Sequence, residues 1–166
     1  MTAVATERLT LRPLDWADRA AYAAMRFHPD VARWLSPADR DPLAAAEATI
    51  ARFRSGWETR GYAPWGVFRE GALIGQCGLN YVPEFAETEV LWALHPDAWG
   101  QGYATEAARA ALAFGFESKG LALIFAVTKP DNLASRAVMK RLGLVRCRDV
   151  VYREIPSVWF DKAISL

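Results

Sequence analysis

The chain has 166 residues, of which 52% are hydrophobic and 23% are charged. This length suits one domain, residues 1–166 with a core over about 8–160, and the composition is globular rather than disordered. Twenty basic and nineteen acidic residues leave a formal net charge of +1, which argues against electrostatic capture of nucleic acid or an anionic membrane. Two cysteines and two histidines are too few for a disulfide framework or a zinc site, so we expect no metal.

Residues 1–10 lack the apolar core of a signal peptide, and no apolar run is long enough to cross a bilayer. The sequence therefore predicts a cytoplasmic protein with no membrane partner. Cys77 and Cys147 have no histidine motif that would activate a thiol. Both are expected to be small buried apolar residues.

The first half of the chain reads as one strand followed by helices. Apolar and polar residues alternate over Arg8–Leu14, which predicts a strand. Apolar residues at helical spacing then predict helical segments at Trp16–Phe27, Asp30–Leu35 and Pro42–Thr59. Asp15 stands at the N-cap position of the first, and Gly61 follows the end of the last.

The second half alternates strands with helices. Glu70-Gly71 predicts a hairpin between strands Pro64–Arg69 and Ala72–Tyr81. Later elements are expected at Glu89–Leu94 (strand), Gly102–Ser118 (helix), Leu121–Thr128 (buried strand), Asn132–Leu142 (helix), and Leu144–Arg153 and Val158–Phe160 (strands). This order predicts an α/β fold, a mixed sheet with helices on its faces.

The most informative segment joins the strand at Glu89–Leu94 to the next helix through a loop containing Gly100 and Gly102. Glycines let successive amides converge, and the first turn of a helix adds partial positive charge, so this place suits a phosphate or pyrophosphate. A Walker loop is excluded because Tyr103-Ala104 follows the second glycine. A Rossmann fingerprint fits poorly, since Thr105 replaces its third small residue and no acid ends the next strand. A glycine-rich turn without a ligand stays open.

Downstream, Asn132-Leu-Ala-Ser-Arg-Ala-Val-Met-Lys-Arg-Leu-Gly-Leu144 follows the buried strand. Here the sequence resembles the GNAT superfamily of acetyl-CoA-dependent N-acetyltransferases. Its cofactor pattern Gln/Arg-x-x-Gly-x-Gly/Ala is matched by Trp99-Gly-Gln-Gly-Tyr-Ala104 except at the first position. The tryptophan variant and the opening Thr6-Glu-Arg-Leu-Thr-Leu-Arg-Pro-Leu14 resemble the branch that acetylates ribosomal-protein N-termini.

The resemblance implies a single-domain, largely antiparallel sheet with helices on both faces, and acetyl-CoA as co-substrate. The amides of residues 101–105 would hold the pyrophosphate, the strand ending at Leu94 would pair with the pantetheine, and Arg136 would reach the phosphates. The implied cofactor-binding residues are Leu94, His95, Trp99, Gly100, Gln101, Gly102, Tyr103, Ala104, Thr105, Asn132, Ser135 and Arg136.

Acetyl transfer to an amine needs a neutral nucleophile, an oxyanion donor and a proton for the thiolate. Glu89 is the first candidate base, with a solvated strand-end carboxylate as the alternative interpretation; Glu154 on a late strand is the second candidate. Family members often place a tyrosine acid seven residues after the Asn132 position, where this chain has Met139. The acid would then be Ser135, unless that hydroxyl only satisfies helix-terminal backbone groups. A backbone amide near Leu94 would be the oxyanion donor.

The resemblance implies direct attack by a primary amine in a ternary complex, with a protein N-terminal α-amino group or a small amine such as an aminoglycoside as acceptor. A non-catalytic acyl-CoA-binding sensor is the alternative from another class. An acidic rim of Glu84, Glu87 and Glu89 could attract a cationic amine, or these residues could form a solvated loop. Monomer and homodimer both stay open, and no nucleic-acid partner is expected. Four tryptophans could line an acceptor pocket or pack in the core: Trp34, Trp65, Trp92 and Trp159.

Overall fold

The computed structural model describes residues 1–37 and 41–165. Its strands are β1 (Val4–Ala5), β2 (Thr10–Arg12), β3 (Pro64–Arg69), β4 (Ala72–Val82), β5 (Glu87–Leu94), β6 (Leu123–Thr128), β7 (Val145–Tyr152) and β8 (Ile155–Ala163). They form one sheet in the order β1-β2-β3-β4-β5-β6-β8-β7. Within the described residues, every neighbouring pair is antiparallel except β5 and β6, which are parallel.

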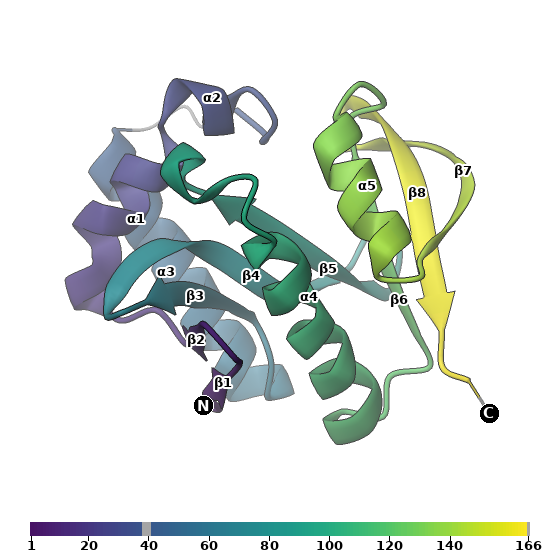
Figure 1. Ribbon diagram of the computed structural model, residues 1–166, viewed down its shortest axis with the longest axis horizontal. Coiled ribbons are helices and arrows are strands. Elements are labelled where there is room, and N and C mark those ends of the chain that lie inside the picture. The colour runs from purple at the N-terminus through teal and green to yellow at the C-terminus, as the bar shows by residue number, and fades with distance from the viewer. Residues whose placement is uncertain (38–40, 166) are drawn as a thin grey trace.

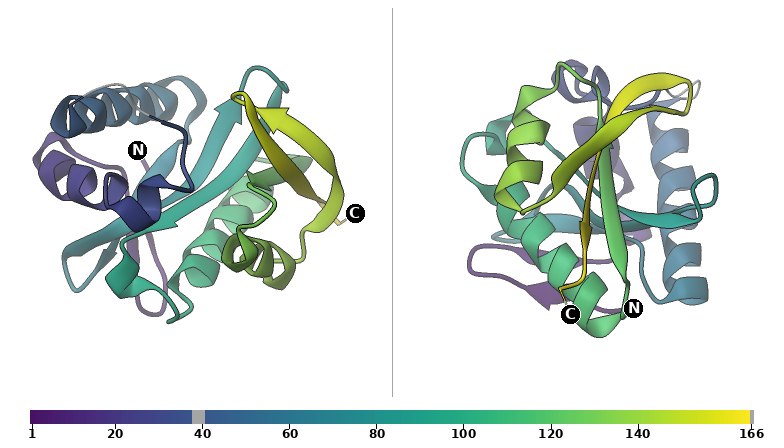
Figure 2. Two further views of the ribbon diagram at one scale, coloured as in Figure 1. Left: turned by 90° about the horizontal axis from the view of Figure 1, so that it is seen from above. Right: turned by 90° about the vertical axis from the view of Figure 1, so that its right-hand side faces the viewer.

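Helices cover both faces of this sheet, with α3 on one side and α4 and α5 on the other (Figures 1 and 2). The helical elements are η1 (Trp16–Asp18), α1 (Arg19–Arg26), α2 (Pro29–Ala32), α3 (Pro42–Arg60), η2 (Pro96–Ala98), α4 (Tyr103–Ala113), the π-helical turn η3 (Phe114–Ser118) and α5 (Leu133–Arg141). The predicted α/β architecture is therefore confirmed. No helix in the described part of the chain has the length and apolarity needed to cross a membrane.

Local sequence signals explain where several helices begin and end. Asp15 accepts a hydrogen bond from the Trp16 amide and begins η1, as its N-cap position predicts. The Asp41 carboxylate caps α3, and Gly61 ends that helix in the left-handed conformation with φ 73°. These caps satisfy backbone groups that the helices leave unpaired.

Several strand boundaries differ from the prediction by one or two residues, and those of β2 and β8 differ most. The expected strand at Arg8–Leu14 is ordered as β2 only over Thr10–Arg12, because it pairs with β3 over just those residues. Strand β8 is longer than Val158–Phe160, because its later residues continue to pair with β6, Asp161 with Phe125 and Lys162 with Ile124. The prediction ended β8 at its last large apolar residue, but backbone hydrogen bonds to β6 continue the strand through the polar residues that follow.

The two cysteines lie in different environments. Cys77 on β4 is fully buried, as expected. Cys147 is exposed, so its predicted burial is wrong. The reason is topological: β7 is the outermost strand of the sheet, and most of its residues face solvent.

Strands β5 and β6 separate soon after they meet. Their parallel pairing consists of Thr88 with Ile124 and Glu89 with Phe125. Beyond these two pairs the C-terminal half of β5 pairs with β4 alone, up to Leu94 opposite Gly75. The sheet therefore opens between β5 and β6, and this opening leads into the cleft described next.

Candidate active site

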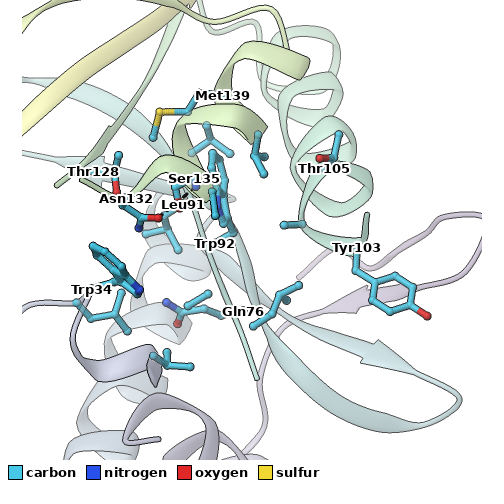
Figure 3. Close-up of a pocket in the computed structure, with 18 of the residues that line it drawn as sticks. Trp34, Gln76, Leu91, Trp92, Tyr103, Thr105, Thr128, Asn132, Ser135 and Met139 are labelled. Atoms are coloured by element: carbon cyan, nitrogen blue, oxygen red, sulfur yellow. Dashed lines mark hydrogen bonds between the residues drawn. The ribbon is translucent and has the colours of Figure 1, made fainter. Parts of the chain in front are cut away.

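A cleft of about 1560 Å³ occupies the opening between β5 and β6. Residues of β5, the end of β6, and the N-terminal ends of α4 and α5 line it, and α1 and α3 also contribute. Figure 3 shows Trp92, Asn132 and Ser135 near its centre, with Trp34 on one side and Thr105 on the other. Trp34 and Trp92 thus line the cleft, while Trp65 and Trp159 are buried in the core.

The glycine loop leads directly into the first turn of α4. Gly100 and Gly102 have φ values of 73° and 81°, a conformation that L side chains rarely adopt. Gly102 is the N-cap of α4, and its carbonyl accepts the Glu106 amide. The amides of Tyr103, Ala104 and Thr105 therefore have no partner within the helix. These amides and the helix dipole suit a phosphate, as the sequence predicts.

Trp99, the residue that departs from the family pattern, ties this loop to the end of β5. Its indole Nε1 donates a hydrogen bond to the Leu94 carbonyl oxygen at 2.8 Å. The amide of His95 donates to Ile74 on the β4 side. Because backbone groups alternate along a strand, the N–H of Leu94 points the other way, into the cleft. Leu94 thus offers the cleft the backbone amide expected of an oxyanion donor.

Arg8 braces the loop from the N-terminal segment, a role that the sequence analysis missed. Its Nη1 donates to the Gln101 carbonyl at 2.8 Å, its Nε donates to Glu106 at 2.7 Å, and its guanidinium lies 4.4 Å from the Tyr103 ring centroid. Thr6 also donates to Glu106. Burial acts to raise the pKa of Glu106, but the hydrogen bonds from Thr6 and Arg8 outweigh it and lower that pKa.

Glu89 is buried beside the cleft, with 5% of its surface exposed. Its Oε1 accepts hydrogen bonds from Asn80 Nδ2 at 2.8 Å and from the Tyr152 hydroxyl at 3.2 Å. Burial raises the pKa of Glu89, and the hydrogen bonds and the positive charges of Arg153 and Arg52 oppose this only in part. The interpretation of Glu89 as a solvated strand-end carboxylate is therefore wrong.

The other acidic candidates lie elsewhere. Glu154 was expected on a strand, but it lies exposed in the turn between β7 and β8, with φ 65°, and does not line the cleft. Glu84 and Glu87 also do not line the cleft. Of Glu84, Glu87 and Glu89, only Glu89 lines the cleft, while Glu84 acts electrostatically on Tyr152 from outside it.

At the start of α5, Asn132 is buried and its Oδ1 caps the helix by accepting the Ser135 amide at 3.2 Å. The capping role considered for Ser135 thus belongs to Asn132, and Ser135 lines the cleft half-buried. Met139 lies one turn further along, fully buried. Arg136 donates to the Pro130 carbonyl at 2.8 Å and does not line the cleft.

Residues 8–145 match the model of the acetyltransferase (GNAT) domain family. The chain therefore belongs to the GNAT family and is an acetyltransferase. The fold just described, with a sheet that opens beside a glycine loop and a helix N-terminus, is consistent with that membership.

Individual relatives and solved structures are also acetyltransferases by name. FsC-acetyl coenzyme A-N(2)-transacetylase of Aspergillus fumigatus is 31% identical over 150 residues, which are 84% of this chain; the match spans 63% of that longer relative. An acetyltransferase structure from Agrobacterium tumefaciens superposes with a TM-score of 0.87 at 29% identity, over 99% of this chain and 95% of its own. A ribosomal L7/L12 α-N-protein acetyltransferase solved with coenzyme A shares the fold with a TM-score of 0.82 at 17% identity, over 98% of each chain.

Proposed function

We propose that the protein transfers the acetyl group of acetyl-CoA to a primary amine by direct attack in a ternary complex. The observation that carries this proposal is Glu89, a buried carboxylate with raised pKa on the strand that leads to the glycine loop. A carboxylate whose pKa is raised by burial is a stronger base than an exposed one, and is suited to take a proton from an amine at neutral pH. The coenzyme A bound to the ribosomal L7/L12 acetyltransferase supports the same class of donor.

The donor would bind along the open edge of β5. The amides of residues 101–105 would hold its pyrophosphate, and the backbone near Leu94 would pair with the pantetheine as an added strand does. Asn132 and Ser135 would border the thioester, on the α5 side of the cleft. His95 and the hydrogen bond from the Trp99 indole to the Leu94 carbonyl would fix the point where β5 passes into the loop. Arg136 would have to exchange its Pro130 contact for a phosphate.

The chemistry then needs only groups that line the cleft. Glu89 would take a proton from the ammonium, directly or through water, and the neutral nitrogen would attack the thioester carbon. The Leu94 amide would stabilise the oxyanion of the tetrahedral intermediate. As the C–S bond breaks, the Ser135 hydroxyl would protonate the departing thiolate of coenzyme A. The attacking nitrogen would release its surplus proton, which would return to the Ser135 oxygen through water, and Glu89 would pass its own proton to solvent. Asn80 and Tyr152 would act through Glu89 as positioning residues.

The acceptor that we favour is a protein N-terminal α-amino group. Its pKa near 8, against about 10.4 for lysine, means that less help is needed to deprotonate it. Two fold neighbours support this choice: the ribosomal L7/L12 α-N-protein acetyltransferase and a ribosomal-protein-S5-alanine acetyltransferase from Vibrio fischeri. A small amine is the alternative acceptor.

The test is release of coenzyme A thiol from acetyl-CoA with a panel of N-terminal peptides and small amines. With a verified acceptor, we expect Glu89→Gln to lower kcat/KM about 100-fold and Ser135→Ala to lower it as well, with acetyl-CoA affinity unchanged. Glu154→Gln separates the second candidate base and is expected to have little effect. Wild-type kcat/KM in both Glu89→Gln and Ser135→Ala would overturn the assignment, and acetyl-CoA binding without turnover of any amine would indicate a sensor instead.

A further inference from the structure

Arginines from separate elements line the cleft near the candidate base. Arg26 ends α1, Arg52 lies in the middle of α3, and Arg153 lies in the turn between β7 and β8. Arg52 and Arg153 both act electrostatically on Glu89, and Arg26 and Arg52 both act on Tyr22. Helix α3 covers the face of the sheet opposite α4 and α5 (Figure 2). This positive charge is therefore separate from the amides at the start of α4 that suit the cofactor phosphates.

These guanidinium groups form no close ion pair in the part of the chain that the structure describes, although Glu89 attracts Arg52 and Arg153 from a longer range. No carboxylate in residues 1–37 and 41–165 forms an ion pair with Arg26, Arg52 or Arg153. Arg26 donates to the Ser36 carbonyl at 2.5 Å, which uses one of its five N–H groups. Desolvation lowers the pKa of Arg26 and Arg52, and a neighbouring arginine lowers each further. Guanidinium groups stay charged nevertheless, so a bound anion would relieve this repulsion.

A buried amide adds a neutral donor to the same side of the cleft. Gln76 on β4 is 7% exposed and lines the cleft. Its Oε1 accepts a hydrogen bond from the buried Tyr22 hydroxyl at 2.5 Å. With the oxygen engaged, the NH₂ group is the end left for a ligand, and Figure 3 shows this side chain pointing toward the side on which Trp34 lies. Burial raises the pKa of Tyr22 to about 12, so its hydroxyl remains a donor and fixes the amide's orientation.

We propose that Arg26, Arg52 and the Gln76 amide form an anion subsite, so that the acceptor amine carries a carboxylate or phosphate group. This inference rests on the proposed acetyl transfer and narrows its substrate class. Arg153, in the turn between β7 and β8, adds long-range attraction. The anion would be held against α1 and α3, which leaves the amine to point along the cleft toward Glu89. Arginine suits this task because its planar fork matches carboxylate and phosphate oxygens.

The test uses three pairs of amines that differ in one anionic group: phenylalanine and its amide, two tripeptide amides with glutamate or glutamine in second place, and phosphoethanolamine and ethanolamine. We expect wild-type enzyme to prefer the anionic member of at least one pair by about tenfold or more in kcat/KM. In Arg26→Gln, Arg52→Gln and the double variant this preference should shrink. Arg52 also acts on Glu89, but any resulting change in the base affects both members of a pair alike and cancels in their ratio. The pair that responds identifies the anion as an α-carboxylate, a side-chain carboxylate or a phosphate.

Arg54→Gln is the matched control, because Arg54 lies on the same helix but pairs with Asp15 and does not line the cleft. Equal rates within all three pairs, or a preference that persists in the double variant, would overturn the subsite. If no probe is acetylated, dissociation constants are measured by calorimetry on enzyme saturated with coenzyme A. Tighter anionic binding that the arginine variants abolish would support the subsite while the acetyl-transfer proposal fails. Equal dissociation constants would overturn the subsite independently.

Discussion

The role proposed for Glu89 in the chemistry comes with a cost in stability. Burial raises its pKa, so the folded state binds this proton more tightly than the unfolded chain does. The favourable contribution is complete below the unfolded pKa of about 4.3 and is lost as the pH rises through the folded value. At pH 7, well above the unfolded value, this favourable contribution is reduced, because burial disfavours the charged form in the folded state.

Glu89→Gln should accordingly raise the Tm at pH 7, and the difference from wild type should narrow as the pH falls toward 4. Glutamine keeps the shape and an Oε1 that can accept from both Asn80 and Tyr152, while it removes the ionisable group whose charged form burial disfavours. Scanning calorimetry across this pH range measures the effect, with the exposed Glu84→Gln as control. A lower Tm for Glu89→Gln at pH 7 would contradict the argument.

Asn80 donates to the charged form of Glu89 and so lowers its pKa. Asn80→Ala should therefore move the pKa of Glu89 to a still higher value, and Tyr152→Phe should move it in the same direction. The readout is the carboxyl carbon resonance of Glu89 during a pH titration, assigned by its disappearance in Glu89→Gln. A pKa that stays unchanged in both variants would show that neither residue positions the base.

At the scale of elements, the N-terminal segment and α4 form one functional unit. Arg8→Ala removes the contacts to Gln101 and Glu106 together. We expect the dissociation constant for coenzyme A to rise about tenfold, since loop positioning is lost, with a small change in kcat. Arg19→Ala is the control, because Arg19 is about as exposed as Arg8 and forms an ion pair with Glu47 away from the loop. Equal effects of the two variants on coenzyme A binding would overturn the bracing role.

The glycine loop can be tested against a glycine of similar backbone conformation elsewhere. Gly100 and Gly120 have φ values of 73° and 65°, and a Cβ on either would meet no protein atom within 4 Å. Both alanine variants should lose a similar amount of stability, about 1 kcal/mol. Only Gly100→Ala should also weaken coenzyme A binding, as measured by calorimetry. Equal binding by the two variants would show that the loop does not hold the phosphates.

The sequence predicted those features that depend on interactions between neighbouring residues. The hairpin at Glu70-Gly71 and the glycine loop before α4 could be located because turn chemistry resides in adjacent residues. The brace between Arg8 and Glu106 joins positions 98 residues apart, and no local pattern marks it. The burial of Glu89 likewise depends on Tyr152 from a distant strand. The sequence motifs thus located the glycine loop, whereas the contacts that hold the loop and Glu89 in place could be identified only from the structure.

At the scale of the whole molecule, the sheet has two parts, β1 to β5 and β6 with β8 and β7, joined by β5 and β6. The order of the strands follows the family fold, and the proposed chemistry draws on residues from both parts. Glu89 and the glycine loop belong to the first part, and Asn132 and Ser135 follow β6 in the second. A substrate that lies between them therefore contacts both.

Only two residue pairs join β5 to β6 in the described residues, so binding of the donor beside them should also affect how long the protein survives in a cell. A pantetheine arm hydrogen-bonded to the free edge of β5 would connect the two parts of the sheet for as long as the donor stays bound. Binding to the folded state alone adds about 2.7 kcal/mol at a hundredfold excess over the dissociation constant. Proteases that cut at transient openings should then spare the loaded enzyme, so its abundance in a cell would rise and fall with the supply of its own acyl donor.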